Sequence, residues 1–356
     1  MPNPPNRPNK PATKSQSSSS QSSNSPVPTV PKPYQLVSLP KTSIDRQSPT
    51  THDRFKPDRL TGKIKLQLTV RTTAFVASGT VAMGTDLGSP KTRGVPLIKT
   101  SVERDGKLII PGSSLKGVVR SAYEAITLSC LCKTKAKKEQ IPNGYQECKT
   151  KTQLCPACRV FGSLNFQGLI HFSDAIGTDA DFSVGFMPSL YAPRPRRSEY
   201  YINGKVAGRK FYYHAIHAVD KGQKQGISVQ QAGGSFIFTT IIKFKNLTEA
   251  ELGTLLVVLG QDQEKAKIAL KVGGGKPVGM GTMTVEVIEI EYLKNWKNYY
   301  TNYESEPESL TDNLLEQFKQ KSIKSAHQNL IQSDQLNQLV QVLKWPTDRE
   351  PPEGMY

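Results

Sequence analysis

Acidic residues are scarce in this chain: 30 aspartates and glutamates stand against 47 lysines and arginines, which gives a formal net charge of +17 at pH 7. A chain this basic is typical of proteins that bind nucleic acid or an anionic membrane surface. Long apolar runs are absent as well, and without about 18 consecutive apolar residues no membrane span is expected. No apolar segment of signal-peptide type lies near residue 1, so we expect a cytoplasmic protein.

Cysteine is scarce too, and its five residues all lie between positions 130 and 158. A disulfide framework would spread an even number of cysteines through a small secreted chain. This odd, clustered set therefore indicates a metal site in a reducing compartment. Cys155 and Cys158 form a C-x-x-C pair without the thioredoxin-like context that a redox role requires.

Structural zinc takes four cysteine or histidine ligands in a tetrahedron. We expect three of them to be Cys148, Cys155 and Cys158, with Cys132 or Cys130 as the fourth. Cys130 lies four residues after Ile126 and continues the apolar face of a predicted helix, which favours a core position and makes Cys132 the preferred choice. Four protein ligands leave no open coordination position, so the zinc is expected to be structural.

Aromatic residues are few in the first 55 residues, which are rich in Pro, Ser, Asn and Thr. Such a segment cannot bury enough apolar surface to offset chain entropy, so residues 1–55 are expected to be a disordered tail. Regular patterns begin after it. Between residues 64 and 70 apolar and polar residues alternate, which predicts a half-buried strand with a basic outer face.

The next patterns predict a helix from Gly112 to about Leu128, strands over residues 168–173 and 235–245, a helix that starts at the capping box Thr248 to Glu251, and a strand over residues 282–290. This β-α-β-β-α-β order is the ferredoxin-like α+β arrangement, which leaves one sheet face open. We expect one domain over residues 56–291, with insertions at about residues 130–160 and 176–232. Residues 292–356 carry two helical patterns, and this extension docks either on the domain or on a partner.

Two segments have the composition of phosphate-binding sites. After Pro111 and Gly112, either Ser113 or Ser114 is a candidate N-cap at the positive end of a helix, and Lys116 and Arg120 share one helical face at an i, i+4 spacing. The second segment is the glycine loop over residues 272–281, which matches neither a Walker A loop nor a dinucleotide fingerprint. Its backbone N–H groups can approach phosphates closely, and its candidate residues are Gly273, Gly274, Gly275, Lys276 and Gly279.

Residues 191–213 interleave cations with aromatic rings. In proteins that bind single strands, cations hold the phosphate backbone while rings stack on bases. The candidate RNA-binding residues here are Arg194, Arg196, Arg197, Arg209, Lys210 and Tyr212. His214 and His217 follow, and they are candidates for an acid–base pair or, at an i, i+3 spacing, for metal ligands.

Four segments stand out together, in this order: Pro111-Gly112-Ser113-Ser114-Leu115-Lys116-Gly117, the Cys155–Cys158 pair with its continuation to Ser163, Phe172-Ser173-Asp174-Ala175, and the loop over residues 273–281. They resemble motifs of the RAMP superfamily of CRISPR proteins. More narrowly, they resemble the backbone subunits of type III effector complexes, over roughly residues 60–290.

The resemblance implies a ferredoxin-like (RRM-like) core whose copies stack along a guide RNA. It implies guide and target RNA and other type III CRISPR subunits as partners, and an inserted thumb or finger around residues 185–210 that distorts the guide–target duplex. It also implies guide-backbone contacts from the glycine loop and from the helix after Gly112. We expect the open sheet face, ringed by cations and glycines, to hold the guide strand.

Many such subunits cut target RNA with an aspartate just before a proline. The matching proline here is Pro96, and Gly94 and Val95 precede it, so the acid is missing from that position. Asp86 is the nearest candidate, where a carboxylate would orient a 2′-OH or bind Mg²⁺ or Mn²⁺. One alternative is a RAMP endoribonuclease that processes the precursor guide through His214 or His217. Another is a stand-alone single-strand-binding protein.

Overall fold

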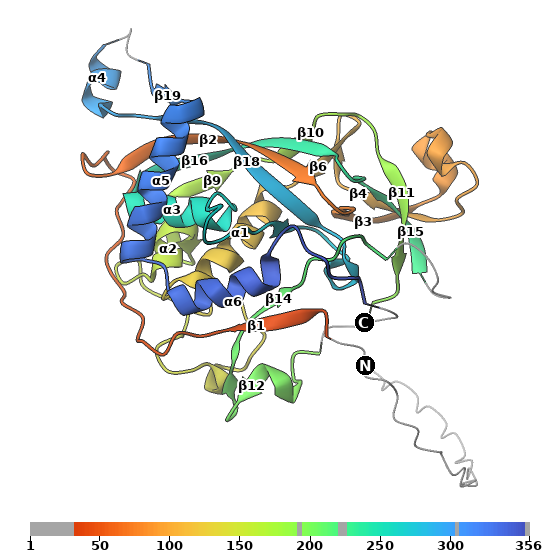
Figure 1. Ribbon diagram of the computed structural model, residues 1–356, viewed down its shortest axis with the longest axis horizontal. Coiled ribbons are helices and arrows are strands. Elements are labelled where there is room, and N and C mark those ends of the chain that lie inside the picture. Colours follow the sequence, from red (N-terminus) through yellow and green to blue (C-terminus); the bar gives the residue numbers. More distant parts are fainter. Residues whose placement is uncertain (1–31, 191–193, 220–225, 303–305, 353–356) are drawn as a thin grey trace, which may run out of the picture. The chain divides into compact units, whose positions relative to one another are not determined.

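The computed structural model describes residues 32–190, 194–219, 226–302 and 306–352. Its main sheet is antiparallel, and the three longest strands lie side by side with β2 in the middle (Figure 1). These strands are β2 (Leu60–Val70), β16 (Ile237–Leu247) and β18 (Thr282–Tyr292). The mixed α+β class and the predicted long strands are confirmed.

Shorter strands extend this sheet. β9 (Ile170–Phe172) and β10 (Ala175–Gly177) pair with β16, and β17 (Leu270–Lys271) and β19 (Glu308–Leu310) pair with β18. β6 (Lys107–Ile110) pairs with β10, and β5 (Glu103–Arg104) pairs with β6. The order of the long path is therefore β17-β18-β2-β16-β10-β6-β5.

Two helices, α1 (Gly112–Ile126) and α3 (Glu249–Val258), pack on the sheet face that carries Ile64, Leu66 and Leu68. The capping box predicted at Thr248 is present, since the N–H of Glu251 donates to the Thr248 hydroxyl over 3.0 Å. α3 is buried on all sides from Glu251 to Val258 because α5 (Asp312–Asn329) packs on its outer surface. The α3–α5 contact is close enough that a Cβ on Gly253 would overlap the Ser322 carbonyl oxygen.

On the opposite face of the main sheet, two lysines of β2 are paired with glutamates of β18. Lys63 lies 2.6 Å from Glu291, and Lys65 lies 2.6 Å from Glu289 on the neighbouring strand β18. These cross-strand pairs balance the basic outer face that the sequence predicted. The glycine loop and Lys116 lie instead around α1, which packs on the other face. The expectation that they border the open face is therefore wrong.

A second sheet has the order β11 (Ser183–Pro188), β15 (Gly226–Gln231), β4 (Ile98–Ser101) and β3 (Ala77–Ala82), with a parallel pair between β15 and β4. The segment from β3 to β4 projects from the domain as an arm with two short helical turns (Figure 1, orange). Val81, Met83 and Leu97 are exposed on this arm.

The prediction of a disordered tail up to residue 55 is wrong for its last part. β1 (Tyr34–Ser38) pairs with β14 (Gly208–Tyr212), and Tyr34 and Val37 are buried. The Ser38 N–H donates to the Gln338 side chain of α6 (Ser333–Leu343) over 2.8 Å. The apolar residues of β1 gave no clear strand signal, because the segment around them is rich in proline and serine. The rest of the predicted tail, residues 1–31, lies outside the described residues.

The C-terminal extension docks on the domain, which decides between the two alternatives. α5 packs on α3, and α6 contacts α1, β1 and β14. The remaining elements are α2 (Pro156–Phe161), α4 (Trp296–Thr301) and the hairpins formed by β7 (Gly162–Ser163) with β8 (Phe166–Gln167) and by β12 (Tyr201–Ile202) with β13 (Lys205–Val206). None of the helices in the described ranges combines the length and apolar character needed to span a bilayer.

Candidate nucleic-acid interface and cysteine centre

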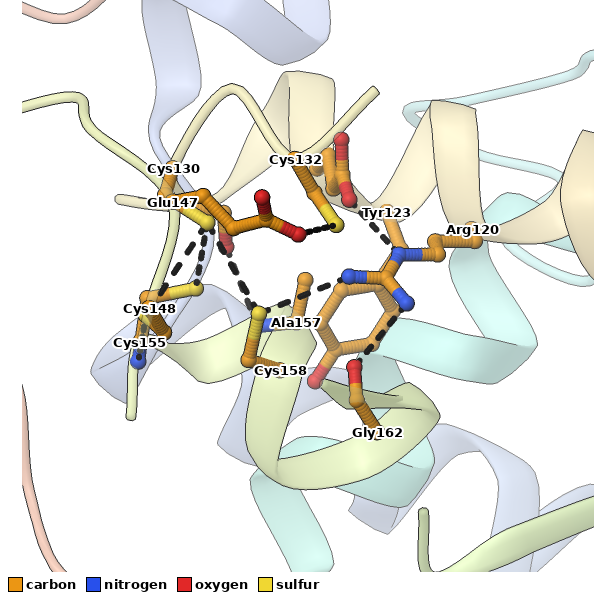
Figure 2. A network of polar contacts seen from close by, with 12 residues as sticks. Arg120, Tyr123, Cys130, Cys132, Glu147, Cys148, Cys155, Ala157, Cys158 and Gly162 are labelled. Atoms are coloured by element: carbon orange, nitrogen blue, oxygen red, sulfur yellow. Dashed lines mark hydrogen bonds and ion pairs between the residues drawn. The ribbon is translucent and has the colours of Figure 1, made fainter. Parts of the chain in front are cut away.

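Four buried cysteines converge between the end of α1 and the start of α2 (Figure 2). They are Cys130, Cys148, Cys155 and Cys158, and their sulfur atoms all lie within 4.8 Å of one another. The Sγ of Cys130 lies 3.6 Å from that of Cys155, 3.7 Å from that of Cys158 and 3.9 Å from that of Cys148. A tetrahedral ion with metal–sulfur distances of about 2.3 Å would place its sulfurs about 3.8 Å apart. The group can therefore hold such a metal ion.

The geometry selects Cys130 as the fourth member, so the preference for Cys132 is corrected. Cys132 lies beside the group, with its Sγ 3.4 Å from a Glu147 carboxylate oxygen (Figure 2). Cys130 lies beyond the end of α1, because Thr127 already has extended backbone angles. The helical periodicity that suggested a core position for Cys130 had therefore ended before it. Contacts among the thiols lower the pKa of Cys148 and Cys155 and raise the pKa of Cys130 and Cys158, because neighbouring sulfurs share protons.

Arg120 and Arg209 both make hydrogen bonds around this centre. Arg120 donates to the Gly162 carbonyl and to the Glu124 carboxylate, and its Nη2 lies 3.4 Å from the Cys158 Sγ (Figure 2). Arg209 donates to the carbonyl oxygens of Ser129 and Cys130 over 2.8 and 2.9 Å. Their side chains are only 17% and 9% exposed. Both arginines are therefore engaged within the protein, and Arg209 also lines a pocket beside α1.

The N-terminus of α1 is not the open anion site that the sequence predicted. Its N-cap residue is Pro111, so Ser113 and Ser114 lie inside the first turn and are exposed, and neither is the N-cap. The Asp174 carboxylate accepts the Gly112 N–H over 2.9 Å and already supplies the negative charge that a helix N-terminus favours. Any anion site on α1 must therefore lie along its side.

A pocket of about 490 Å³ opens along that side of α1. It lies between α1, β14, β17 and the glycine loop, and it brings together six of the predicted RNA-binding residues: Ser114, Lys210, Tyr212, Gly273, Gly274 and Lys276. Gly117 also lines it, and a Cβ at that position would meet no atom within 4 Å. A second pocket, of about 380 Å³, shares Ser121, Lys210 and Phe211 with the first and is lined by Lys133 and Lys135. We call the two pockets together the α1 groove.

The glycine loop requires its glycines. Gly273, Gly275 and Gly279 have φ angles of 80°, 64° and 88°, a region that other residues rarely adopt. The Gly274 N–H donates to the Phe75 carbonyl over 2.8 Å, so this amide is engaged within the protein. The N–H groups of Gly273 and Gly275 make no hydrogen bond to any residue that the structure describes. Gly273 lines the groove and offers an amide donor there, whereas Gly275 is buried and does not line it.

Lys210 is held at the junction of the two pockets by aromatic rings. Its Nζ lies 3.9 Å from the centre of the Tyr34 ring and 4.7 Å from that of Tyr212, and it donates to the Tyr200 hydroxyl. Burial lowers the pKa of Lys210, but the contacts with Tyr200 and Tyr212 outweigh it and leave the pKa raised. Lys210 is therefore a fixed positive charge in the groove, and Tyr212 has an ordered position beside it.

The other predicted cations lie outside the larger pocket. Lys116 is half-buried, and burial, together with the charge of Arg120, lowers its pKa. Arg194 and Arg196 are exposed in the loop before β12, and Arg197 is half-buried there. Pro195 of the same loop lines the second pocket, so the loop borders the groove. Residues 191–193 of the predicted finger lie outside the described residues.

Asp86 is exposed on the arm between β3 and β4. Its carboxylate accepts the Met83 N–H over 3.3 Å and so caps a helical turn. In the described part of the chain, the four cysteines are the only group of three or more potential metal-binding side chains. A Mg²⁺ or Mn²⁺ site at Asp86 therefore has no support from neighbouring protein ligands.

The two histidines differ in accessibility. His214 is 1% exposed, and its ring nitrogens contact the Thr282 hydroxyl and the Ala269 carbonyl. Burial lowers its pKa to about 3, so it stays neutral and out of reach of a substrate. His217 is exposed and lies 3.8 Å from Glu350. A processing mechanism that uses His214 is therefore contradicted, and that hypothesis now depends on His217 alone.

Sequence reasoning missed one lining residue, the buried Lys271 of β17, which lines the larger pocket together with Gly273 and Gly274. The available signal was a lysine within the apolar segment Ile268-Ala269-Leu270-Lys271-Val272. A charged residue in a buried strand is unusual enough to suggest a functional role.

The family model of the RAMP superfamily matches residues 67–284 of this chain. A search of curated proteins found no match. Among solved structures, the chain is similar to a chain from the structure described as the type III-B Cmr-beta complex bound to cognate target RNA. The sequence identity is 17% and the TM-score 0.34, and the alignment covers 66% of this chain and 61% of that one.

Proposed function

Because this chain belongs to the RAMP superfamily, we propose that it is a guide-RNA-binding backbone subunit of a type III CRISPR ribonucleoprotein, which helps to recognise complementary target RNA. The observation that carries the proposal is the α1 groove. Its larger pocket alone gathers residues from five separate segments of a strongly basic chain, and it combines cations, an amide donor and an ordered tyrosine. Such a surface suits a single-stranded phosphate backbone with its bases.

The order of the strands supports the same proposal. Within the main sheet, β18, β2, β16 and β9 are neighbours in that order, and α1 and α3 each connect two of these strands along the chain. We infer that these elements are the ferredoxin-like (RRM-like) core, with the cysteine segment and residues 176–232 as its insertions. Under this proposal, the loop with Arg194, Arg196 and Arg197 is the thumb or finger, and the partners are guide RNA, target RNA and other type III subunits.

We also propose that the cysteine centre binds structural zinc. Cys130, Cys148, Cys155 and Cys158 would hold the ion, and four buried sulfurs within 4.8 Å of one another suit zinc. In this position zinc would link the segment after α1 to α2. Arg209 of β14 donates hydrogen bonds to the carbonyls of Ser129 and Cys130 in the same segment. The metal would therefore stabilise the walls of the groove without taking part in chemistry.

A charge placed in the groove tests the proposed function. Gly117→Glu introduces a carboxylate into open space, so the fold tolerates it, whereas a bound phosphate backbone is repelled. We expect at least a tenfold loss of affinity for single-stranded RNA, which is about 1.4 kcal/mol. The measurement is a titration of labelled RNA at fixed salt, together with sequencing of RNA that co-purifies with the wild-type protein.

Gly234→Glu is the matched control, because Gly234 is also exposed and a Cβ added there would meet no atom within 4 Å. It lies before β16, outside the residues that line the groove. The substitution adds the same charge and should leave RNA affinity unchanged. An equal loss in both variants would mean that overall charge, and not the groove, governs binding. A wild-type protein without bound guide-like RNA and without salt-dependent RNA affinity would overturn the proposal.

Target cleavage through Asp86 is an extension of this proposal. The exposed carboxylate on the arm is free to meet an RNA strand, and Asp86→Asn keeps the oxygen that caps Met83. We expect this variant to bind guide and target RNA normally and to lose metal-dependent cleavage of target RNA. The assay compares cleavage by the assembled complex with that of Asp179→Asn, an exposed aspartate elsewhere. Cleavage that persists in Asp86→Asn would remove this residue from the reaction.

A further inference from the structure

Lys271 is a buried lysine for which no described residue of the chain provides a partner. It is 5% exposed, and its Nζ makes no hydrogen bond to any atom of the described residues. It lines the larger pocket of the α1 groove together with Gly273, Gly274 and Lys276. An ionised ammonium group is strongly disfavoured in such a place unless an anion accompanies it.

The surroundings offer Lys271 no compensating charge. The charged and titratable side chains that line the pocket with it are Lys210, Tyr212 and Lys276, and the described lining includes no carboxylate. Its positive charge also acts on the buried His214. Burial, and then the charge of Lys276, lowers the pKa of Lys271 to about 7. The pocket is thus a basic cavity whose described lining supplies no carboxylate as a counter-ion.

We propose that this pocket is a site for one phosphate group, in which Lys271 is the buried counter-ion of a single phosphodiester of the bound RNA. The proposal rests on the proposed function and adds to it a specific residue. The Gly273 N–H, the Ser114 hydroxyl and the Lys276 ammonium are donors in the same pocket. A phosphate oxygen placed among them would give Lys271 the partner that the protein does not supply.

The sign of the pH dependence follows from this arrangement. In the RNA-free protein, Lys271 loses its proton as the pH rises through about 7. A phosphate beside it stabilises the charged form and raises its pKa, so RNA binding takes up a proton. RNA affinity should therefore be greatest below pH 7 and should fall as the pH rises above it.

Lys271→Met tests the site, because methionine keeps most of the volume and removes the charge. For a labelled single-stranded RNA oligonucleotide, we expect weaker binding, a salt slope reduced by about 0.7 and no fall of affinity across neutral pH. Without RNA, the melting temperature should not decrease, since the variant loses an unpaired buried charge. If Lys271 had only a structural role, Lys271→Met would lower the melting temperature of the RNA-free protein.

Two further variants complete the experiment. Lys271→Arg stays charged at all these pH values and should bind RNA without the pH response, which keeps the test valid if the methionine variant does not fold. Lys243→Met removes an exposed lysine of β16, outside the groove, and should leave the pH response intact.

Three results would overturn parts of the proposal, and they are distinguishable. If wild type binds RNA and Lys271→Met binds it with the same salt slope and pH response, the phosphate site is wrong while the proposed function stands. If wild type does not bind RNA, the proposed function itself fails. If millimolar inorganic phosphate displaces the RNA and raises the melting temperature of wild type but not of Lys271→Met, the site serves free phosphate instead of the RNA backbone.

Discussion

Cys158→Ser is expected to remove nearly all bound zinc and to destabilise the protein severely. Wild type should contain about one zinc per chain, held by four ligands. Cys158 lies in α2, its Sγ is 3.7 Å from that of Cys130, and it also contacts Arg120. Because zinc binding contributes directly to folding in such sites, the free energy of unfolding should fall by more than about 4 kcal/mol. Metal analysis of the purified protein and denaturant unfolding measure the two effects.

Cys132→Ser is the matched control, since Cys132 lies next to the centre but outside the group of four. This variant should keep its zinc and nearly all of its stability. A strong chelator should reproduce the effect of Cys158→Ser in wild type. Loss of zinc in Cys132→Ser, with full retention in a Cys130→Ser variant, would reverse the assignment of the fourth ligand. A zinc-free wild type of unchanged stability would remove the metal from the proposal.

Gly253→Ala should have the second large effect, because α3 and α5 contact each other at this residue. A methyl group there would overlap the Ser322 carbonyl oxygen and approach Ala326. Both obstacles belong to α5, so the two helices must move apart. We expect a loss of about 3 kcal/mol in the free energy of unfolding, at the upper end of ordinary overpacking. Chemical denaturation followed by circular dichroism measures it.

The same substitution at Gly117 should have the opposite sign. Gly117 also lies within a helix, but a methyl group there meets open space. Alanine is favoured over glycine inside a helix by about 1 kcal/mol, so Gly117→Ala should stabilise the protein slightly. Equal effects of the two alanine substitutions would show that α5 is not seated on α3 as described.

The sequence predicted the elements that depend on periodicity. Alternation between residues 64 and 70 identified β2, and the capping box at Thr248 identified the start of α3 to the residue. The same reasoning failed where a partner distant in the sequence decides the outcome. Asp174 occupies the N-terminus of α1, and β14 gives β1 the hydrogen bonds that its own composition did not suggest.

In the candidate site, too, local sequence patterns predicted some residues correctly, whereas contacts between distant residues decided the others. The C-x-x-C spacing indicated the metal-binding group, but spacing alone could not choose between Cys130 and Cys132, because the choice depends on where α1 ends. Residue type marked Arg120 and Arg209 as RNA-binding, whereas the nearby Glu124 and backbone carbonyls draw both inward. Lys271 was overlooked because one lysine in an apolar strand has no periodic signature.

The way β1 is held has a consequence for the newly synthesised chain. β1 needs β14 for its hydrogen bonds and α6 for its cover, and Lys344, just after α6, bridges back to Ile268 beside β17. Contacts between such distant segments form late, because long loops must close first. During synthesis, β1 therefore emerges from the ribosome well before α6 exists to cover it. The apolar side of β1 is then exposed, and a chaperone that binds apolar segments would act at this stage.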